Sequence, residues 1–127
     1  MTYFKNRSGD LIWLRSVYFI GNRRYVKIGH DVRPDYVVAG LNNLTSGRLY
    51  PRDLAHYGRV HLLWHTPGGQ SEEFAYHRQF TKHRASGLDQ RDEYRDSIGE
   101  WFDADPVVAW LVAKGHLVAL PWKEAAS

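Results

Sequence analysis

The chain has 127 residues, of which 43% are hydrophobic and 14% aromatic, and its formal net charge is +3. This length and composition suit one domain with a buried core and exclude a disordered chain. The absence of cysteine excludes a disulfide framework and a thiolate metal site. The polar start of the chain lacks a secretion signal, and its longest apolar stretch, within PVVAWLVAKG, is too short to span a bilayer. We therefore expect one domain over residues 1–127 of a cytoplasmic protein without a membrane segment.

The positive charge is concentrated in the first half of the chain. Residues 1–61 contain ten Lys and Arg against four Asp and Glu, whereas residues 62–127 contain seven against ten. Arginine, which binds phosphate through two parallel hydrogen bonds, outnumbers lysine twelve to five. This distribution favours a polyanion as partner, and DNA is the polyanion we expect. Ordinary scatter of charge over a solvated surface explains a net charge of +3 equally well.

Two strands joined by a short turn are predicted near the N-terminus. Leu11–Ile20 (LIWLRSVYFI) and Arg24–His30 (RYVKIGH) are rich in aromatic and β-branched residues, and GNR links them. The position of the turn decides whether Tyr18 pairs with Lys27 or with Tyr25. Because Tyr25 and Lys27 point to the same face, either register places the hydroxyl of Tyr18 beside an amine or a second hydroxyl.

The rest of the chain predicts a third strand and three helices. We expect a helix that opens at Arg33-Pro34-Asp35 and stops near Gly47, a strand over Tyr57–Thr66, a helix from Ser71 to about residue 86, a polar loop over 88–99 and a helix over about 105–115. The order β-β-α-β-α-α predicts an α+β domain, in which helices flank a small antiparallel three-stranded sheet.

The second predicted helix carries the residues of greatest chemical interest. Glu73, His77, Phe80 and Arg84 share one stripe of this helix. Because Phe80 must enter the core, the carboxylate of Glu73 lies near the sheet and needs a partner. A hard oxygen ligand beside a basic surface suits one Mg²⁺ or Mn²⁺ ion. Alternatively, Glu73 only stabilises the helix N-terminus and pairs with His77 or an arginine.

Four short motifs follow one another along the chain. They are Ser16-Val17-Tyr18, Val26-Lys27-Ile28-Gly29, an E-x-x-x-H-x-x-F run from Glu73 to Phe80, and Glu100-Trp101-Phe102. In this order they resemble the GIY-YIG nuclease superfamily, most closely a phage-associated branch that reads V-K-I-G at the second motif. The resemblance implies a GIY-YIG-like fold, with a motif-bearing core over about residues 11–102.

The resemblance also implies a metal-dependent endonuclease that hydrolyses DNA. Tyr18 would lie beside the attacking water as its base or its orienter, and Lys27 would support it and contact phosphate. Glu73 would bind the metal, which polarises the phosphoryl oxygen and stabilises the leaving group. Further phosphate contacts are expected from basic and imidazole side chains, namely those of Arg23, Arg24, His30, Arg48, His77 and Arg84.

The first predicted helix departs from the family pattern. The family carries an arginine there in an R-L-x-x-L frame, and this chain has Gly40 at that position. Losing such a group commonly lowers a rate by orders of magnitude, and Arg33 is the candidate replacement. Two further functions therefore stay open. One is a catalytically impaired DNA-binding module of the GIY-YIG fold, which Gly40 favours, and the other is a phage accessory or inhibitor protein.

Several other residues are assigned a structural role. His61 and His65 share a face of the third predicted strand, but their spacing matches no zinc signature. Tyr50 and Trp122 have rings suited to base stacking, and no pattern around them favours that role.

Overall fold

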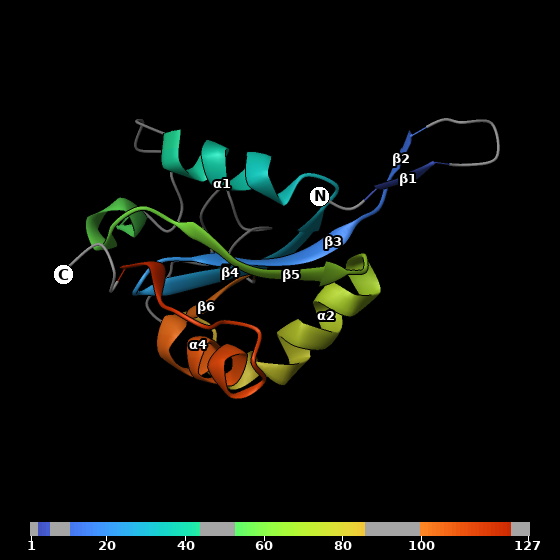
Figure 1. Ribbon diagram of the computed structural model, residues 1–127. Coiled ribbons are helices and arrows are strands. Elements are labelled where there is room, and N and C mark those ends of the chain that lie inside the picture. Colours follow the sequence, from blue (N-terminus) through green and yellow to red (C-terminus); the bar gives the residue numbers. More distant parts are fainter. Residues whose placement is uncertain (1–2, 6–10, 44–52, 86–99, 123–127) are drawn as a thin grey trace, which may run out of the picture.

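The computed structural model describes residues 3–5, 11–43, 53–85 and 100–122 (Figure 1). The strands are β1 (Tyr3–Lys5), β2 (Leu11–Trp13), β3 (Ser16–Gly21), β4 (Tyr25–Asp31), β5 (His61–Pro67) and β6 (Trp101–Asp103). The α-helices are α1 (Pro34–Asn43), α2 (Gln70–Gln79) and α4 (Ala104–Ala113), and the 3₁₀ turns are η1 (Leu54–Tyr57) and η2 (Thr81–His83). This confirms the α+β class. The expected helix stop at Gly47, Arg48, Tyr50 and the expected loop over 88–99 lie outside the described residues.

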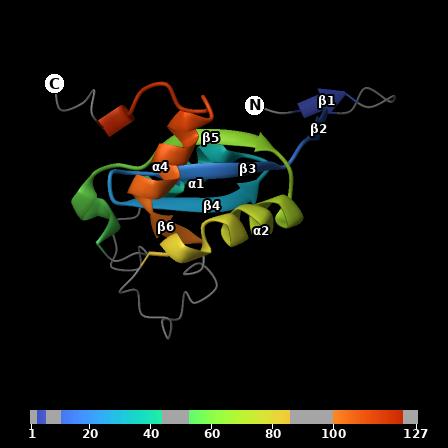
Figure 2. The ribbon, with the colours of Figure 1, turned by 90° about the horizontal axis from the view of Figure 1, so that it is seen from below.

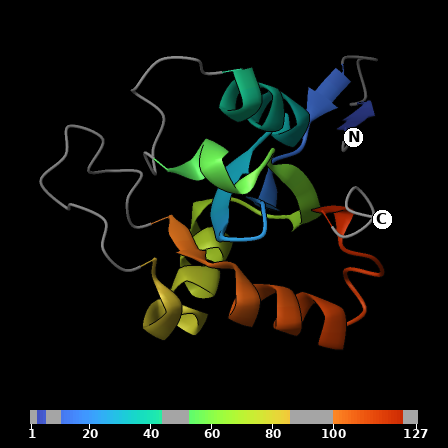
Figure 3. The ribbon, with the colours of Figure 1, turned by 90° about the vertical axis from the view of Figure 1, so that its left-hand side faces the viewer.

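A four-stranded antiparallel sheet forms the middle layer of the protein. Its strand order is β5-β3-β4-β6, and every neighbouring pair is antiparallel. Helix α1 covers one face, while α2 and α4 cover the other (Figures 1 and 3). Strands β1 and β2 pair with each other in a separate two-stranded sheet. Within the described ranges, no helix has the length and apolar character needed to cross a membrane.

The fourth strand of the sheet is a correction to the expected three. Strand β6 pairs with β4 from Tyr25–Asp103 to Lys27–Trp101. Three residues are too few for an alternating pattern to predict a strand, so the sequence predicts none at the E-W-F motif. Successive side chains of a strand point to opposite faces, and Trp101 and Phe102 are accordingly buried in two different clusters.

Both faces of β3 are buried, so the strand contributes to two cores. Val17 and Phe19 belong to the cluster under α2 and α4. Tyr18 and Ile20 belong to the cluster under α1, together with Tyr25, Leu54, Val60 and Trp101. A strand covered on both sides explains why SVYFIG reads as a nearly continuous apolar run.

The β3–β4 register differs from both predicted registers. Tyr18 pairs with Gly29, not with Lys27 or Tyr25. The turn is longer than expected because the backbone N–H of Asn22 donates to the carbonyl of Tyr25 at 3.0 Å. The shift is an even number of residues, so the prediction that Tyr18, Tyr25 and Lys27 share one face is confirmed.

Other predicted boundaries also move. The first expected strand is divided into β2 and β3 around Leu14–Arg15, and the third begins at His61 because η1 occupies Leu54–Tyr57. The register between β3 and β5 shifts at Phe19–Ile20, where β5 contains a β-bulge. His61 and His65 therefore face opposite sides of the sheet and not the same side.

The second helix also has different ends from those predicted. Helix α2 begins at Gln70 instead of after Ser71, because the Glu72 carboxylate accepts the N–H of Gly69 at 2.9 Å. It ends at Gln79, where the hydroxyl of Thr81 donates to the carbonyl of His77 at 2.9 Å. This side-chain bond satisfies a carbonyl of the last helical turn.

Asn22 should be the polar residue on which the stability of the hairpin most depends. Its side chain is fully buried. It donates to the carbonyls of Leu54 and Gly58 and accepts the N–H groups of Arg24 and Tyr25. Asn22→Ala leaves these groups without partners, and we expect it to lower the free energy of unfolding by about 2–4 kcal/mol in urea denaturation. The exposed Asn43→Ala control should change it by less than about 0.5 kcal/mol. Equal effects of the two variants would contradict this assignment.

Candidate functional site

One end of the sheet brings together the starts of two helices and the ends of three strands. Ser16, which opens β3, pairs with Asp31 at the end of β4 and with Pro67 at the end of β5. Helices α1 and α2 begin at Pro34 and Gln70, directly after those strands (Figure 1). Because helix N-termini carry a partial positive charge, this end of the domain suits anionic groups.

Tyr18 crosses β4 over Gly29. A Cβ atom on Gly29 would meet the hydroxyl oxygen and the ring of Tyr18 within contact distance. Tyr18 is only 4% exposed. The glycine of the Lys27-Ile28-Gly29 motif therefore leaves room for the phenol on the neighbouring strand.

The phenol of Tyr18 stays protonated at neutral pH. Burial raises the pKa of Tyr18 far above its usual value, and the negative charges of Glu100, Glu73 and Asp31 raise the pKa further, in that order. A phenolate at this position would be costly because it would be both desolvated and surrounded by carboxylates. At neutral pH the side chain of Tyr18 is therefore a neutral phenol.

Lys27 is paired with a carboxylate that was not among the predicted site residues. Its Nζ lies 3.5 Å from Oε2 of Glu100, and the backbone N–H of Ile28 donates to the carbonyl of Glu100 at 2.8 Å. Burial raises the pKa of Glu100, Lys27 opposes that rise, and the charge of Glu73 adds to it. Glu100 is the first residue of the E-W-F motif, and that was the signal in the sequence for its proximity.

Glu73 is buried between two histidines. It is 3% exposed, its Oε1 lies 3.0 Å from Nδ1 of His30, and its Oε2 lies 3.8 Å from Nε2 of His77. The alternative reading, in which Glu73 pairs with His77, therefore applies in part, with His30 as the closer partner. An ionised carboxylate only accepts hydrogen bonds, so Nδ1 of His30 carries the hydrogen when it bonds Glu73.

His77 attaches α2 to the sheet and does not face outward to a phosphate. Its ring is buried, and Nε2 lies 2.7 Å from the carbonyl oxygen of Ile28. A carbonyl only accepts, so Nε2 carries the hydrogen and donates it. This bond places the second half of β4 beside the turn of α2 that bears Glu73.

A hydrated metal ion held by one or two carboxylates fits these residues better than an ion held by three protein ligands. Across the part of the chain that the structure describes, no group of three or more His, Cys, Asp or Glu residues is arranged to hold a metal. Mg²⁺ keeps several waters and is bound through one or two carboxylates, and Glu73 would supply one. Because Nδ1 of His30 covers Oε1 of Glu73, a metal at that oxygen would require the His30 ring, whose side chain is 25% exposed, to turn away.

The predicted phosphate-binding arginines do not gather at this end of the sheet. Arg23 and Arg24 lie in the β3–β4 turn, at the opposite end of the hairpin, and Arg24 pairs with Asp103 at 2.7 Å. Arg84 follows η2 beyond the end of α2, with its guanidinium 5.5 Å from the ring centre of Phe102.

Arg33, the candidate replacement for the arginine of the first helix, does lie at this end. Its Nε and Nη2 donate to Asp35 at 3.1 and 2.9 Å, and its guanidinium stacks on Tyr36, 3.8 Å from the ring centre. Its backbone N–H donates to the side chain of Asp31 at 2.9 Å. The structure thus groups Tyr18, Lys27, Glu73 and His30 with Glu100, and places Arg33 at the start of the adjacent helix.

Comparisons with known proteins found no match to this chain. No protein family, no curated protein and no solved structure matches the chain.

The contact between Gly29 and Tyr18 can be tested by adding one methyl group. Gly29→Ala should lower the free energy of unfolding by about 1–3 kcal/mol, because the methyl overlaps the buried phenol. Gly40→Ala is the matched control, since its Cβ meets nothing within 4 Å in an exposed helical position, and it should raise stability by up to about 1 kcal/mol. Chemical denaturation measures both, and a neutral Gly29→Ala would contradict the packing.

Glu100 should make a measurable contribution to the pH dependence of stability. The pKa of Glu100 in the folded protein lies above the ordinary 4.5. The protonated carboxyl therefore stabilises the fold below pH 4.5, and this stabilisation is lost as pH rises through the folded pKa. Glu100→Gln keeps the neutral form at every pH. The stability of Glu100→Gln relative to the native chain should therefore increase from about pH 4 to pH 7. A pH-independent difference in urea denaturation would contradict the raised pKa.

Proposed function

We propose that the protein is a metal-dependent endonuclease of the GIY-YIG type that hydrolyses phosphodiester bonds in DNA. The observation that carries the proposal is the convergence of Tyr18, Lys27 and Glu73, which come from three separate sequence motifs. The charge of Glu73 acts on Tyr18 and on Glu100, and Glu100 contacts Lys27. A neutral phenol, an ammonium group and a buried carboxylate within one electrostatic environment are the groups that phosphodiester hydrolysis needs.

Each residue then has a distinct task. Glu73 holds Mg²⁺ or Mn²⁺, and the bound metal supplies Lewis-acid stabilisation of the phosphoryl oxygens and of the leaving group. Tyr18 orients the attacking water through its hydroxyl and does not deprotonate it, because its pKa is raised. Lys27 exchanges its contact with Glu100 for one with the scissile phosphate. Glu100, released from Lys27, is then available to accept the proton of the attacking water.

Phosphate stabilisation by arginine is the weakest part of this machinery. Between Pro34 and Asn43, helix α1 contains no lysine or arginine, and Gly40 faces open space. The Nε and Nη2 groups of Arg33 donate to Asp35, so a phosphate would compete with that carboxylate for them. Removing one electrostatic stabiliser of this kind typically costs about 10²–10³ in rate, so we expect a slow nuclease.

A DNA-binding module without chemistry is the second candidate. The observation that favours it is the closed state of Glu73, which is buried and covered by His30, together with the absence of a basic residue on α1. Such a module would bind DNA through phosphate contacts, with strong salt dependence and no need for a metal.

Nicking of supercoiled plasmid in Mg²⁺ or Mn²⁺ tests the proposal. Glu73→Gln and Tyr18→Phe should each lower the nicking rate by about a hundredfold or more. Two controls match them in chemistry. Glu72→Gln changes the neighbouring exposed carboxylate, and Tyr76→Phe changes a phenol of α2 that packs against the other core cluster. Both variants should keep the native rate.

The outcomes separate the two candidates. Nicking that survives in both Glu73→Gln and Tyr18→Phe would show that the chemistry lies elsewhere. A native chain that shifts plasmid mobility without nicking it, in either metal, would support the binding module.

A further inference from the structure

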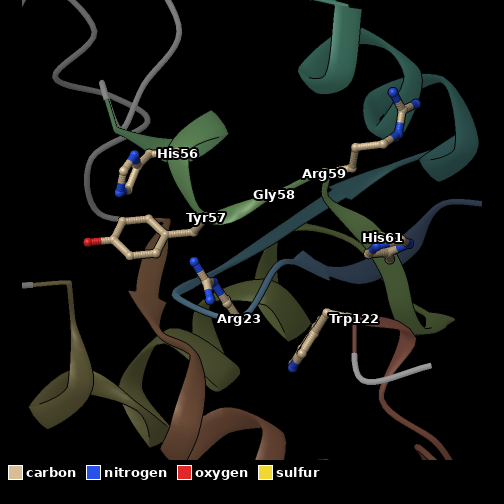
Figure 4. Close-up of a pocket in the computed structure, with 7 residues that line it drawn as sticks. All are labelled: Arg23, His56, Tyr57, Gly58, Arg59, His61 and Trp122. Atoms are coloured by element: carbon tan, nitrogen blue, oxygen red, sulfur yellow. The ribbon is translucent and has the colours of Figure 1, made fainter. Parts of the chain in front are cut away.

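A basic and aromatic hollow lies at the opposite end of the sheet from Glu73. Its volume is about 450 Å³, and its lining includes Arg23, His56, Tyr57, His61 and Trp122. These residues come from the β3–β4 turn, from η1, from the start of β5 and from the last described turn of the chain (Figure 4). The hollow shares none of its residues with the proposed catalytic set.

The fold fixes the walls of this hollow through backbone contacts. The side chain of Asn22 donates to the carbonyls of Leu54 and Gly58 at 2.9 and 3.1 Å, which ties the turn that bears Arg23 to η1. Gly58 has a φ of 99°, a conformation that favours glycine and redirects the chain from η1 into β5. The bulge in β5 pairs His61 with Gly21, and so sets its ring on the side of the sheet covered by α4.

The hollow is lined by a guanidinium group that points inward and by aromatic rings. The guanidinium carbon of Arg23 lies 5.6 Å from the ring centre of Tyr57. Figure 4 shows Arg23, His61 and Trp122 around the hollow, whereas the guanidinium of Arg59 points away from it toward α1. The described residues that line the hollow include no aspartate or glutamate. This surface therefore favours a ligand that has both an anionic group and a planar ring.

We propose that this hollow binds a nucleotide with an unpaired base, whose phosphate contacts Arg23 and whose base stacks on Trp122. The volume lies in the range of small-ligand sites, about 300–1,000 Å³. Arginine binds phosphate through a planar fork, and base stacking on an aromatic side chain does not depend on base identity. The choice of nucleic acid as the ligand rests on the proposed function. The consequence is a preferred substrate that contains a single-stranded segment.

Binding of labelled oligothymidine, followed by fluorescence anisotropy in EDTA, tests the hollow without any hydrolysis. The native chain should bind oligothymidine about tenfold more tightly than an abasic oligonucleotide of the same length. Trp122→Leu should remove that preference, and Trp122→Phe should keep most of it. Arg23→Ala should weaken both ligands and lower the salt dependence by about 0.7 in log–log slope.

Arg78→Ala is the matched control for charge. It removes an exposed arginine of α2 that does not line the hollow, so it should keep the native affinity for both oligonucleotides. Competition with thymidine monophosphate identifies the source of the nucleotide. Displacement by the monophosphate assigns the hollow to single nucleotides, and displacement only by oligothymidine assigns it to a strand.

Two results would overturn the inference. One is a native chain that binds both oligonucleotides equally, and the other is a Trp122→Leu variant that folds, by circular dichroism, and keeps the native preference. Failure of nicking leaves this test intact because EDTA prevents metal-dependent cleavage in it. If the chain prefers oligothymidine to the abasic ligand but does not nick plasmid, the proposed nuclease activity is refuted and nucleotide binding in the hollow is supported.

Discussion

The hydrogen bond from His77 to the carbonyl of Ile28 is the contact on which the arrangement of the site depends. It spans 2.7 Å and joins α2 to β4, next to the point where the ladder between β4 and β6 stops at Lys27 and Trp101. Since the ring of His77 lies one helical turn after Glu73, fixing that ring fixes the carboxylate. Figure 2 shows α2 running alongside β4 on the face that α4 also covers.

Under the proposed function, the electrostatics of the site favour a cation that binds before DNA. Three carboxylates, those of Glu100, Glu73 and Asp31, raise the pKa of Tyr18, and the ammonium of Lys27 faces one of them. A phosphate that approached this group of charges would meet net repulsion. A divalent cation on Glu73 reverses that balance, because it adds two positive charges beside the carboxylates. We therefore expect metal and DNA to bind with positive cooperativity.

Local patterns in the sequence predicted what depends on alternation and helical periodicity. The shared face of Tyr18 and Lys27 followed from the period of two along a strand, and the helix after Pro34 followed from its spacing of apolar residues. The register of the hairpin did not follow, because the side chain of Asn22 sets the turn through bonds to Leu54 and Gly58, more than thirty residues away.

The remaining features depend on contacts between segments that are distant in sequence. Glu73 meets His30 across 43 positions, and strand β6 is only three residues long. The hollow around Arg23 is assembled from three segments that are distant in sequence, namely the β3–β4 turn, residues 56–61 and Trp122, so no local pattern marks it. The motif order indicated that Glu100 lies near the site, but only the structure pairs it with Lys27.

The most direct test of the central claim is whether a divalent metal binds at Glu73. Paramagnetic Mn²⁺, added in small amounts, broadens the NMR signals of nearby protons. The ring signals of His30 and His77 should broaden first, while those of His56 and His61 stay sharp, and Glu73→Gln should abolish this selectivity. Uniform broadening of all four histidines, or selective broadening that persists in Glu73→Gln, would contradict the assignment of Glu73 as the metal ligand.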